Sequence, residues 1–174
     1  GYGADLVASA GSLFETIARE NEQKNAKLEA VLKLVPEADI RRGLKVFRDT
    51  KAACIVCHQM AYLGGRIGPD LSRIGQIRSE RDLLESILFP SASFVRSYES
   101  TTVVTTDGRI LNGVIKDETS LHIELVLDAQ KKERILLEDI EERRPGTLSI
   151  MPTGLDKQLT PQQLADLVKY LKSR

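Results

Sequence analysis

Tryptophan is missing from this sequence, and all aromatic residues together make up only 5% of it. The side chains therefore offer few large flat apolar groups, and a bound macrocycle is one group that supplies such a body. An excess of charge is missing as well. The 25 basic and 25 acidic residues give a formal net charge of +0, so nothing indicates nucleic-acid binding. Hydrophobic residues still reach 41%, which predicts a packed core and excludes global disorder.

Long hydrophobic runs are missing too. No segment reaches the roughly 18 apolar residues of a membrane-spanning helix, so we expect no membrane span. The first residues do not show the basic stretch followed by an apolar one that is typical of a signal peptide. Because the chain begins with glycine, we interpret it as a processed protein or as a piece of a longer one.

Cysteine occurs only twice, as Cys54 and Cys57, and His58 follows directly. A disulfide between the two thiols would close a very small loop and stabilise little. The pattern Cys-Ile-Val-Cys-His is instead that of covalent c-type haem attachment. Two thiols on one turn of chain each add to a haem vinyl group, and the adjacent imidazole binds the iron from the same face. The motif therefore predicts one covalently bound haem c.

Three other interpretations of this motif compete with haem. A thioredoxin-like pair would follow a strand, whereas this pair follows a predicted helix and precedes the glycine-rich segment 64–69. A zinc site needs about four ligands, and the only other histidine, His122, is too distant in sequence for the usual finger spacing. A chance match is the third alternative. We favour haem.

The second axial ligand of the iron is sought among Met60, Met151 and His122. Met60 follows His58 by two residues, a reach of at most about 7 Å, so it cannot pass around the macrocycle and is expected to pack. His122 lies on a predicted strand and should point away from the apolar face, toward the surface. Met151 remains, in a loop before the last helix, although an arbitrary methionine is more often a core residue. Ligation by His58 and Met151 would leave no open iron site, which favours electron transfer over catalysis.

The pattern of the rest of the chain predicts helices around a group of strands. The first helix should begin at a capping box, Ser12 to Glu15, and stop before Pro36, with a polar middle and packing at its two ends. Asp107-Gly108 predicts a hairpin within three or four antiparallel strands over residues 98–138. Alternation in that region places Leu121, Ile123, Leu125 and Leu127 on one face. The remaining predicted helices span residues 39–49, 79–89 and 160–171.

With these motifs in place, the sequence resembles a class I cytochrome c. The residues that match the crossing terminal helices of that family are Gly43, Phe47, Leu167 and Tyr170. The resemblance implies a mainly α cytochrome c fold with an antiparallel β insertion before the axial Met loop, an α+β chain. It covers residues 37–97 and 148–174, which would form the two parts of the haem domain. Residues 1–36 would be an N-terminal helix or linker and residues 98–147 the β-strand insertion.

Two further matches carry implied roles. Gly68-Pro69-Asp70-Leu71 resembles the family segment after the haem motif, and implies that the Pro69 carbonyl accepts a hydrogen bond from the ring of His58. Ser149-Ile150-Met151-Pro152 resembles the axial Met loop. Three residues are candidates for contacts with the haem propionates, although they could equally be ordinary loop residues: Tyr62, Arg66 and Arg73.

A narrower group shares more of the chain, including GPDLSRIG, LLESILFPSASF, TTDGRILNGVI and SIMPTGL. The sequence is similar to the haem-binding C-terminal domains of large planctomycete and verrucomicrobial proteins. That resemblance implies a periplasmic protein, with a signal peptide outside this sequence, that accepts electrons from an upstream dehydrogenase domain or a redox partner protein.

The first hypothesis is therefore a non-enzymatic electron-transfer domain. An alternative is a haem enzyme or sensor with a labile sixth ligand, for instance peroxidase-like, which would need a distal acid–base group such as His122. Another is a module in which the insertion binds a partner. We also hypothesise that the insertion covers part of the distal haem edge.

Overall fold

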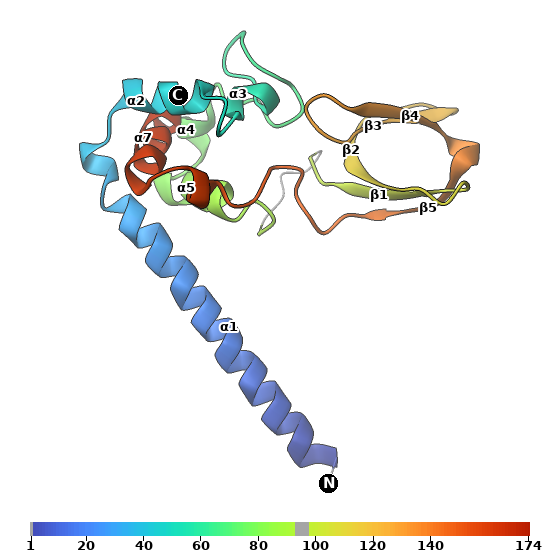
Figure 1. Ribbon diagram of the computed structural model, residues 1–174, viewed down its shortest axis with the longest axis horizontal. Helices are drawn as coiled ribbons and strands as arrows, with labels where there is room; N and C mark the ends of the chain where they lie inside the picture. Colours follow the sequence, from blue (N-terminus) through green and yellow to red (C-terminus); the bar gives the residue numbers. More distant parts are fainter. Residues whose placement is uncertain (1, 93–97) are drawn as a thin grey trace.

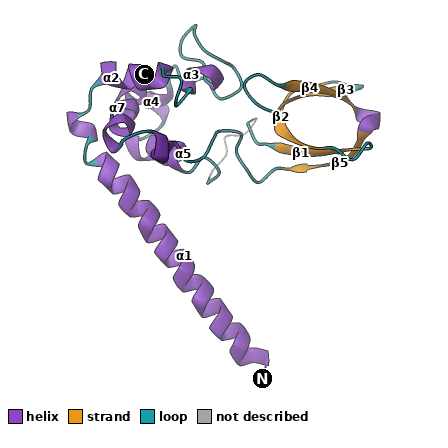
Figure 2. Cartoon of the chain, in the orientation of Figure 1, coloured by secondary structure: helices purple, strands orange, loops and turns teal. Residues whose placement is uncertain are grey.

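The computed structural model describes residues 2–92 and 98–174, and within the first helix it describes side chains at residue 11 and from residue 13 onward. Within this part of the chain the fold is mixed α+β, with seven α-helices and one five-stranded antiparallel sheet. Figure 1 shows a compact group of helices, a long helix that projects from it, and the sheet on the other side. Figure 2 shows that helices and strands form separate units.

The helices are α1 (Tyr2–Leu32), α2 (Ile40–Arg48), α3 (Cys54–Cys57), α4 (Ile74–Ile77), α5 (Glu80–Leu88), α6 (Leu155–Gln158) and α7 (Pro161–Lys172). The strands are β1 (Thr101–Thr105), β2 (Ile110–Glu118), β3 (His122–Val126), β4 (Lys132–Leu136) and β5 (Ile140–Pro145). Short 3₁₀ helices, η1 (Val35–Glu37) and η2 (Leu137–Asp139), follow α1 and β4.

Capping residues set the starts of three helices. The Asp39 side chain accepts from the backbone N–H of Arg42 at the start of α2. Complete capping boxes begin α5 at Ser79 and α7 at Thr160. Each box satisfies backbone N–H groups that have no partner inside the helix, so these boundaries follow from local sequence.

The centre of the helical core is the crossing of α2 and α7. The rings of Phe47 and Tyr170 are both buried and meet with centroids 5.6 Å apart and planes at 49°. Gly43 lies at the point of closest approach, where a Cβ atom would be 2.6 Å from Cβ of Tyr170. Only a residue without a side chain lets these two helices come so close.

An ion pair between an exposed arginine and a buried carboxylate links the same two helices. The side chain of Asp166 on α7 is 3% exposed, and both its oxygens accept from the guanidinium of Arg42, at 2.7 and 2.8 Å. The Asp39 backbone N–H and the Gln162 amide donate to the same carboxylate, at 2.8 and 3.1 Å. Burial raises the pKa of Asp166, but the hydrogen bonds from Arg42, Asp39 and Gln162 outweigh it, so the net pKa lies below its ordinary value.

The long helix α1 differs from its prediction. It is continuous from Tyr2, so the expected start at Ser12 is wrong, because the residues before Ser12 contain no proline and continue the helix. Only its last turns pack on the body, where Leu28 and Val31 are buried. The expected packing at the other end is also wrong for Leu13, which is 59% exposed. No helix in the described residues is both long and apolar enough to cross a membrane.

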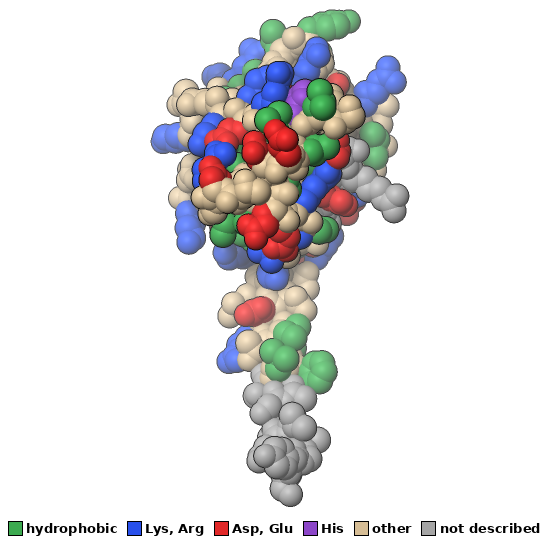
Figure 3. All heavy atoms as spheres, turned by 90° about the vertical axis from the view of Figure 1, so that its right-hand side faces the viewer, with side chains coloured by type: hydrophobic (Ala, Val, Ile, Leu, Met, Phe, Trp, Pro, Cys, Tyr) green, Lys and Arg blue, Asp and Glu red, His purple; other side chains and the backbone are tan. Residues whose placement is uncertain are grey.

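The sheet is a curled unit with its own small core. Its strand order is β4-β3-β2-β1-β5, and β2 pairs with β1 through residues 110–113 and with β3 through residues 114–118. Figure 1 shows β3 and β4 facing β1 and β5, with β2 joining the two halves. The buried residues between them are Val103, Ile123, Leu125 and Ile135. Viewed end-on, the sheet unit displays acidic, basic and hydrophobic groups intermixed (Figure 3).

Several predictions for the strands are confirmed, one is wrong, and one strand was not predicted. The hairpin at Asp107-Gly108 joins β1 to β2, with Gly108 at φ +83°. Residues 98–138 contain four antiparallel strands, as predicted, and the strand that the pattern did not predict is β5, beyond residue 138. Its sequence, IEERRP, has a single hydrophobic side chain and no period of two. Leu121 does not share the buried face, because it lies in the turn before β3 and is exposed.

The sheet leaves and rejoins the helical body at one place. The backbone N–H of Ser149 donates to Oγ of Ser91 at 3.1 Å. Nearer the strands, Oγ of Ser100 donates to the carbonyl of Leu148 at 2.5 Å, and the Gly146 N–H donates to the Ser100 carbonyl at 2.8 Å. The predicted boundary at residue 97, and the last two residues of the segment LLESILFPSASF, lie outside the described residues.

Candidate functional site

The motif residues lie on and directly after the single turn α3. Ala53 precedes the turn in the left-handed region at φ +50°, and its N–H donates to the Asp49 carbonyl, which ends α2 and reverses the chain. Cys54 and Cys57 are the first and last residues of α3. His58 follows in an extended conformation, and its N–H donates to the Cys54 carbonyl at 2.9 Å. The two thiols and the imidazole therefore project from adjacent positions around one turn.

The ring of His58 is held by Pro69. Nδ1 lies 2.9 Å from the Pro69 carbonyl oxygen, which can only accept, so Nδ1 carries the proton and Nε2 carries the free lone pair. Burial lowers the pKa of His58 and outweighs the hydrogen bond to Pro69, which raises it. A neutral imidazole with a fixed ring and an available Nε2 is the form that binds a metal ion.

Three glycines let the following loop close tightly on the motif. A Cβ atom at Gly68 would be 2.6 Å from Cε1 of His58, so the imidazole ring packs directly on the Gly68 backbone. At Gly65 it would be 1.8 Å from the Val56 carbonyl oxygen, and at Gly64 2.2 Å from the His58 carbonyl oxygen. Gly64 also has φ +101°, which favours glycine. The sequence predicted a glycine-rich loop here but not that these glycines line the motif.

The environment of the thiols argues against a redox-active pair. Burial raises the pKa of Cys54 to about 11, against an ordinary value of 9.0. The pKa of Cys57 is also raised, first by burial and then by the carboxylate of Asp128. A thioredoxin-like cysteine requires a lowered pKa, because the thiolate is its nucleophile. Protonated thiols with little thiolate character fit a structural or covalently modified role better.

The effect of Asp128 on the pKa of Cys57 indicates that one end of the sheet lies near the motif. Asp128 lies in the turn between β3 and β4, and its Oδ1 accepts from the backbone N–H groups of Gln130 and Lys131. Figure 1 shows this turn on the side of the sheet that faces α3. The sheet thus approaches the turn that contains Cys54 and Cys57, a proximity that sequence patterns did not indicate.

The three candidate axial ligands occupy different surroundings. Met151 is half-buried against the helical core, as Cys54 is, and its backbone N–H donates to Oγ of Ser149. Met60 is buried in this core, as expected for a packing residue. His122 begins β3, and its Nδ1 lies 3.0 Å from Oγ1 of Thr119. Since β3 runs from His122 toward the turn that contains Asp128, His122 lies at the end of the strand away from Cys57.

Other candidate ligands and contacts do not gather at the motif. Among the residues that the structure describes, no three His, Cys, Asp or Glu side chains are grouped to hold a metal ion, which disfavours the zinc alternative. Tyr62 is fully exposed. Arg73 immediately precedes α4, and Arg66 lies close enough to Asp70 to contribute to the lowered pKa of that carboxyl, after the larger effect of Ser72.

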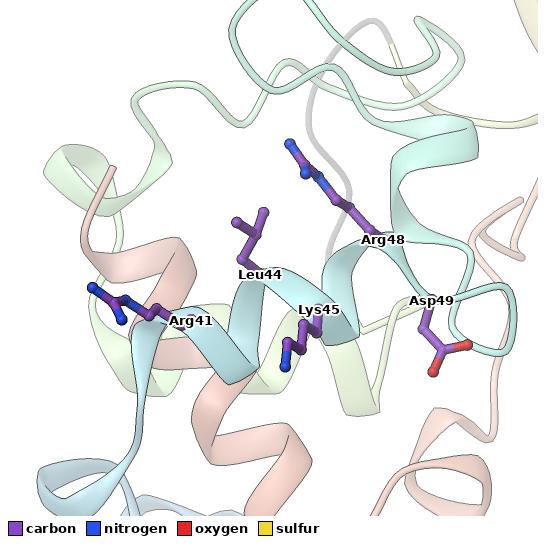
Figure 4. Close-up of a pocket in the computed structure, with 5 residues that line it drawn as sticks. All are labelled: Arg41, Leu44, Lys45, Arg48 and Asp49. Carbon is purple, nitrogen blue, oxygen red and sulfur yellow. The ribbon is translucent and has the colours of Figure 1, made fainter.

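A shallow open hollow of about 550 Å³ lies on the outer side of α2, but it is separate from the motif. Figure 4 shows the five residues that line it, Arg41, Leu44, Lys45, Arg48 and Asp49, projecting from α2 and from the residue after it. None of the predicted site residues lines this hollow. Its cationic side chains indicate a solvated helix face.

No protein-family model matches the sequence, and no curated protein is significantly similar to it.

Proposed function

We propose that this chain is a c-type cytochrome domain that carries single electrons through one haem. Cys54 and Cys57 would hold the haem covalently, and His58 and Met151 would bind its iron from opposite faces. The observation that carries the proposal is the 2.9 Å contact between Nδ1 of His58 and the Pro69 carbonyl, which leaves Nε2 free. It accompanies two thiols on the same turn, at the spacing of covalent haem attachment.

The described residues fit such a group chemically. Protonated, partly buried thiols are suited to addition across a vinyl double bond, which forms one thioether at each cysteine. The glycine-rich loop fixes the imidazole on one side, and Met151 supplies a thioether sulfur from the loop before α6. When bound, the haem supplies an iron that changes oxidation state by one electron. Two protein ligands on that iron favour electron transfer over substrate binding.

The wider setting is part of the same proposal. The resemblance to class I cytochromes c supports a haem domain interrupted by strands, and the narrower resemblance supports a periplasmic protein. Its electrons would come from a dehydrogenase, either an upstream domain or a separate redox partner. Because the turn that contains Asp128 lies near Cys57, we also propose that the sheet covers part of the haem edge.

An absorption spectrum of protein from a host that attaches haem c tests this proposal. We expect a low-spin spectrum with a ferric sulfur-to-iron charge-transfer band, which Met151→Ala should abolish. Met60→Leu is the matched control, because it removes the other methionine with little change in volume and should keep the band. Colourless protein with two free thiols would overturn the proposal. A high-spin ferric spectrum would favour a haem enzyme or sensor with an open sixth site.

A further inference from the structure

We infer that Asp70 and Ser72 are positioning residues for the iron ligand, because together they hold the Pro69 carbonyl against the ring of His58. This inference rests on the proposed function, and it assigns a role to two polar residues that do not themselves touch His58.

A relay of hydrogen bonds runs from Ala61 through Ser72 to Asp70. Oδ1 of Asp70 accepts from both the backbone N–H and the hydroxyl of Ser72, at 2.8 and 2.5 Å. The Ser72 hydroxyl has one proton, which it gives to Asp70, so its oxygen is free to accept from the Ala61 N–H at 2.6 Å. The relay therefore has a fixed direction, from Ala61 through Ser72 to a carboxylate, and the negative charge of Asp70 strengthens the bond from the Ser72 hydroxyl.

The relay links the segment that follows His58 to the segment that follows Pro69. Ala61 is three residues beyond His58, and Ser72 is three residues beyond Pro69, so the relay joins the two segments that carry the imidazole and its acceptor. The Leu71 N–H donates to the Gln59 carbonyl at 2.9 Å, between the same segments. The Gln59 side chain donates to the Ala61 carbonyl at 2.7 Å.

Hydrogen bonds hold the chain on the N-terminal and on the C-terminal side of Pro69. On its N-terminal side, the Gly68 N–H donates to the Cys57 carbonyl at 2.8 Å, which ties the loop to α3. On its C-terminal side, the only ties to the motif segment among the described hydrogen bonds are the Leu71 N–H and the relay through Ser72. Proline has no N–H of its own, so the position of its carbonyl depends on these neighbours.

A strained residue lies at one end of the relay. Ala61 adopts φ +54°, a left-handed conformation that a non-glycine residue rarely takes. The paired backbone hydrogen bonds of Met60 and Leu63 close a turn around Ala61, and the hydrogen bond from its N–H to Ser72 is a further restraint on it. Strain of this kind persists where the surroundings over-determine the conformation, and here they do so beside the candidate ligand.

The expected effect on the iron follows from the chemistry of imidazole. Donation from Nδ1–H to a carbonyl makes Nε2 a stronger ligand, which stabilises the oxidised iron more than the reduced iron. A loosened Pro69 carbonyl weakens this donation, so the reduction potential should rise. Changes in such supporting residues typically alter metal affinity by about tenfold or more.

The test compares variants of the haem-loaded protein. For Ser72→Ala we expect the ratio of oxidised to reduced affinity to fall about tenfold, a rise in potential of about 59 mV for a one-electron couple. The paramagnetically shifted NMR signals of the His58 ring should move as well. Ser72→Thr keeps a hydroxyl and should restore the parent potential. Asp70→Asn keeps the acceptor but removes its charge, and should give an intermediate shift.

The chain offers a matched control. Ser79 and Asp82 form another serine–aspartate pair, the capping box at the start of α5, in which each side chain accepts from the backbone N–H of the other residue at 3.1 Å. Ser79→Ala should lower thermal stability without moving the potential.

Two results would overturn the inference while leaving the proposed function intact. One is a Ser72→Ala protein with the parent potential and His58 signals, and the other is an equal shift in Ser79→Ala. If the parent protein binds no haem, the proposed function and this inference fail together, before any variant is needed.

Discussion

A Cβ atom added to Gly43 would lie 2.0 Å from the carbonyl oxygen of Asp166, so α2 and α7 touch backbone to backbone. No side chain fits at a separation of this kind without moving one helix. The helix that contains Gly43 leads directly into the Cys54 turn, and the helix that contains Asp166 follows the loop of Met151. Their crossing therefore sets the distance between the two parts of the candidate site.

Gly43→Ala should accordingly destabilise the protein strongly. Overpacking of a tight contact costs about 1–3 kcal/mol and sometimes more, and urea unfolding should show that loss as a lower midpoint. Gly11→Ala is the control, because a Cβ atom there meets nothing within 4 Å and alanine favours a helix. If both variants unfold at the parent midpoint, the close approach of the helices does not exist in solution.

Acid should weaken the protein through Asp166. Its pKa is lowered in the folded state, chiefly by Arg42 and the other donors that overcome its burial. The carboxylate therefore adds stability above its ordinary pKa of 3.8, and that stability is lost as the pH falls through the lowered folded value. Urea midpoints measured from about pH 6 to pH 2 should show this loss in the parent. They should show a flatter acid limb in Asp166→Asn, and an unchanged limb would contradict the prediction.

Arg42→Ala tests the same ion pair from its exposed partner. Removing the guanidinium leaves the buried carboxylate with two other donors, so we expect a measurable loss of stability at neutral pH. The measurement is the free energy of unfolding. Arg41→Ala, one residue away and exposed, is the comparison and should cost far less.

The cysteines should react slowly in the folded haem-free chain. With its pKa raised to about 11 by burial, only about one Cys54 thiol in a thousand is ionised at pH 8. Alkylation followed by mass spectrometry should therefore be much slower than in urea, and its rate should rise with pH. Equal rates in the folded and unfolded chains would contradict the prediction, and a faster rate in the folded chain would point to an activated, thioredoxin-like pair.

The sheet should be removable as a unit. Joining Ser91 to Ser149 through a short glycine–serine linker should leave the thermal transition of the helical body in place. The two buried clusters are distinct, and the ends of the excursion already meet. Circular dichroism should show loss of strand signal with helix retained. If the spliced protein also keeps the parent reduction potential and partner rates, the sheet does not cover the haem edge.

Local chemistry explains which parts of the fold were predictable. The helix starts at Ser79 and Thr160 are predictable from sequence, because both hydrogen bonds of a capping box form within four residues. The Asp107-Gly108 turn is equally local. By contrast, β5 is an exposed edge strand in which apolar and polar residues do not alternate. The capping pattern at Ser12 does not begin a helix, because α1 is already helical before it.

In the candidate site, too, contacts within short segments were predictable and contacts between distant segments were not. Cys54, Cys57 and His58 lie close together in sequence, so the sequence alone shows their motif. The contact between His58 and Pro69 was predicted from a family resemblance. Arg42 and Asp166 lie 124 residues apart, and no local pattern pairs them. The relay through Ser72 and the approach of Asp128 also depend on how distant segments pack, which a single sequence does not specify.

The unequal packing of α1 gives the molecule two levels of local stability. Every described side chain from residue 13 to residue 27 is exposed, while Leu28 and Val31 are buried in the body. The outer turns can open without disturbing the core, so their amide protons should exchange with solvent almost as fast as those of a free peptide. The amides of the last turns should exchange only when the whole helical body unfolds.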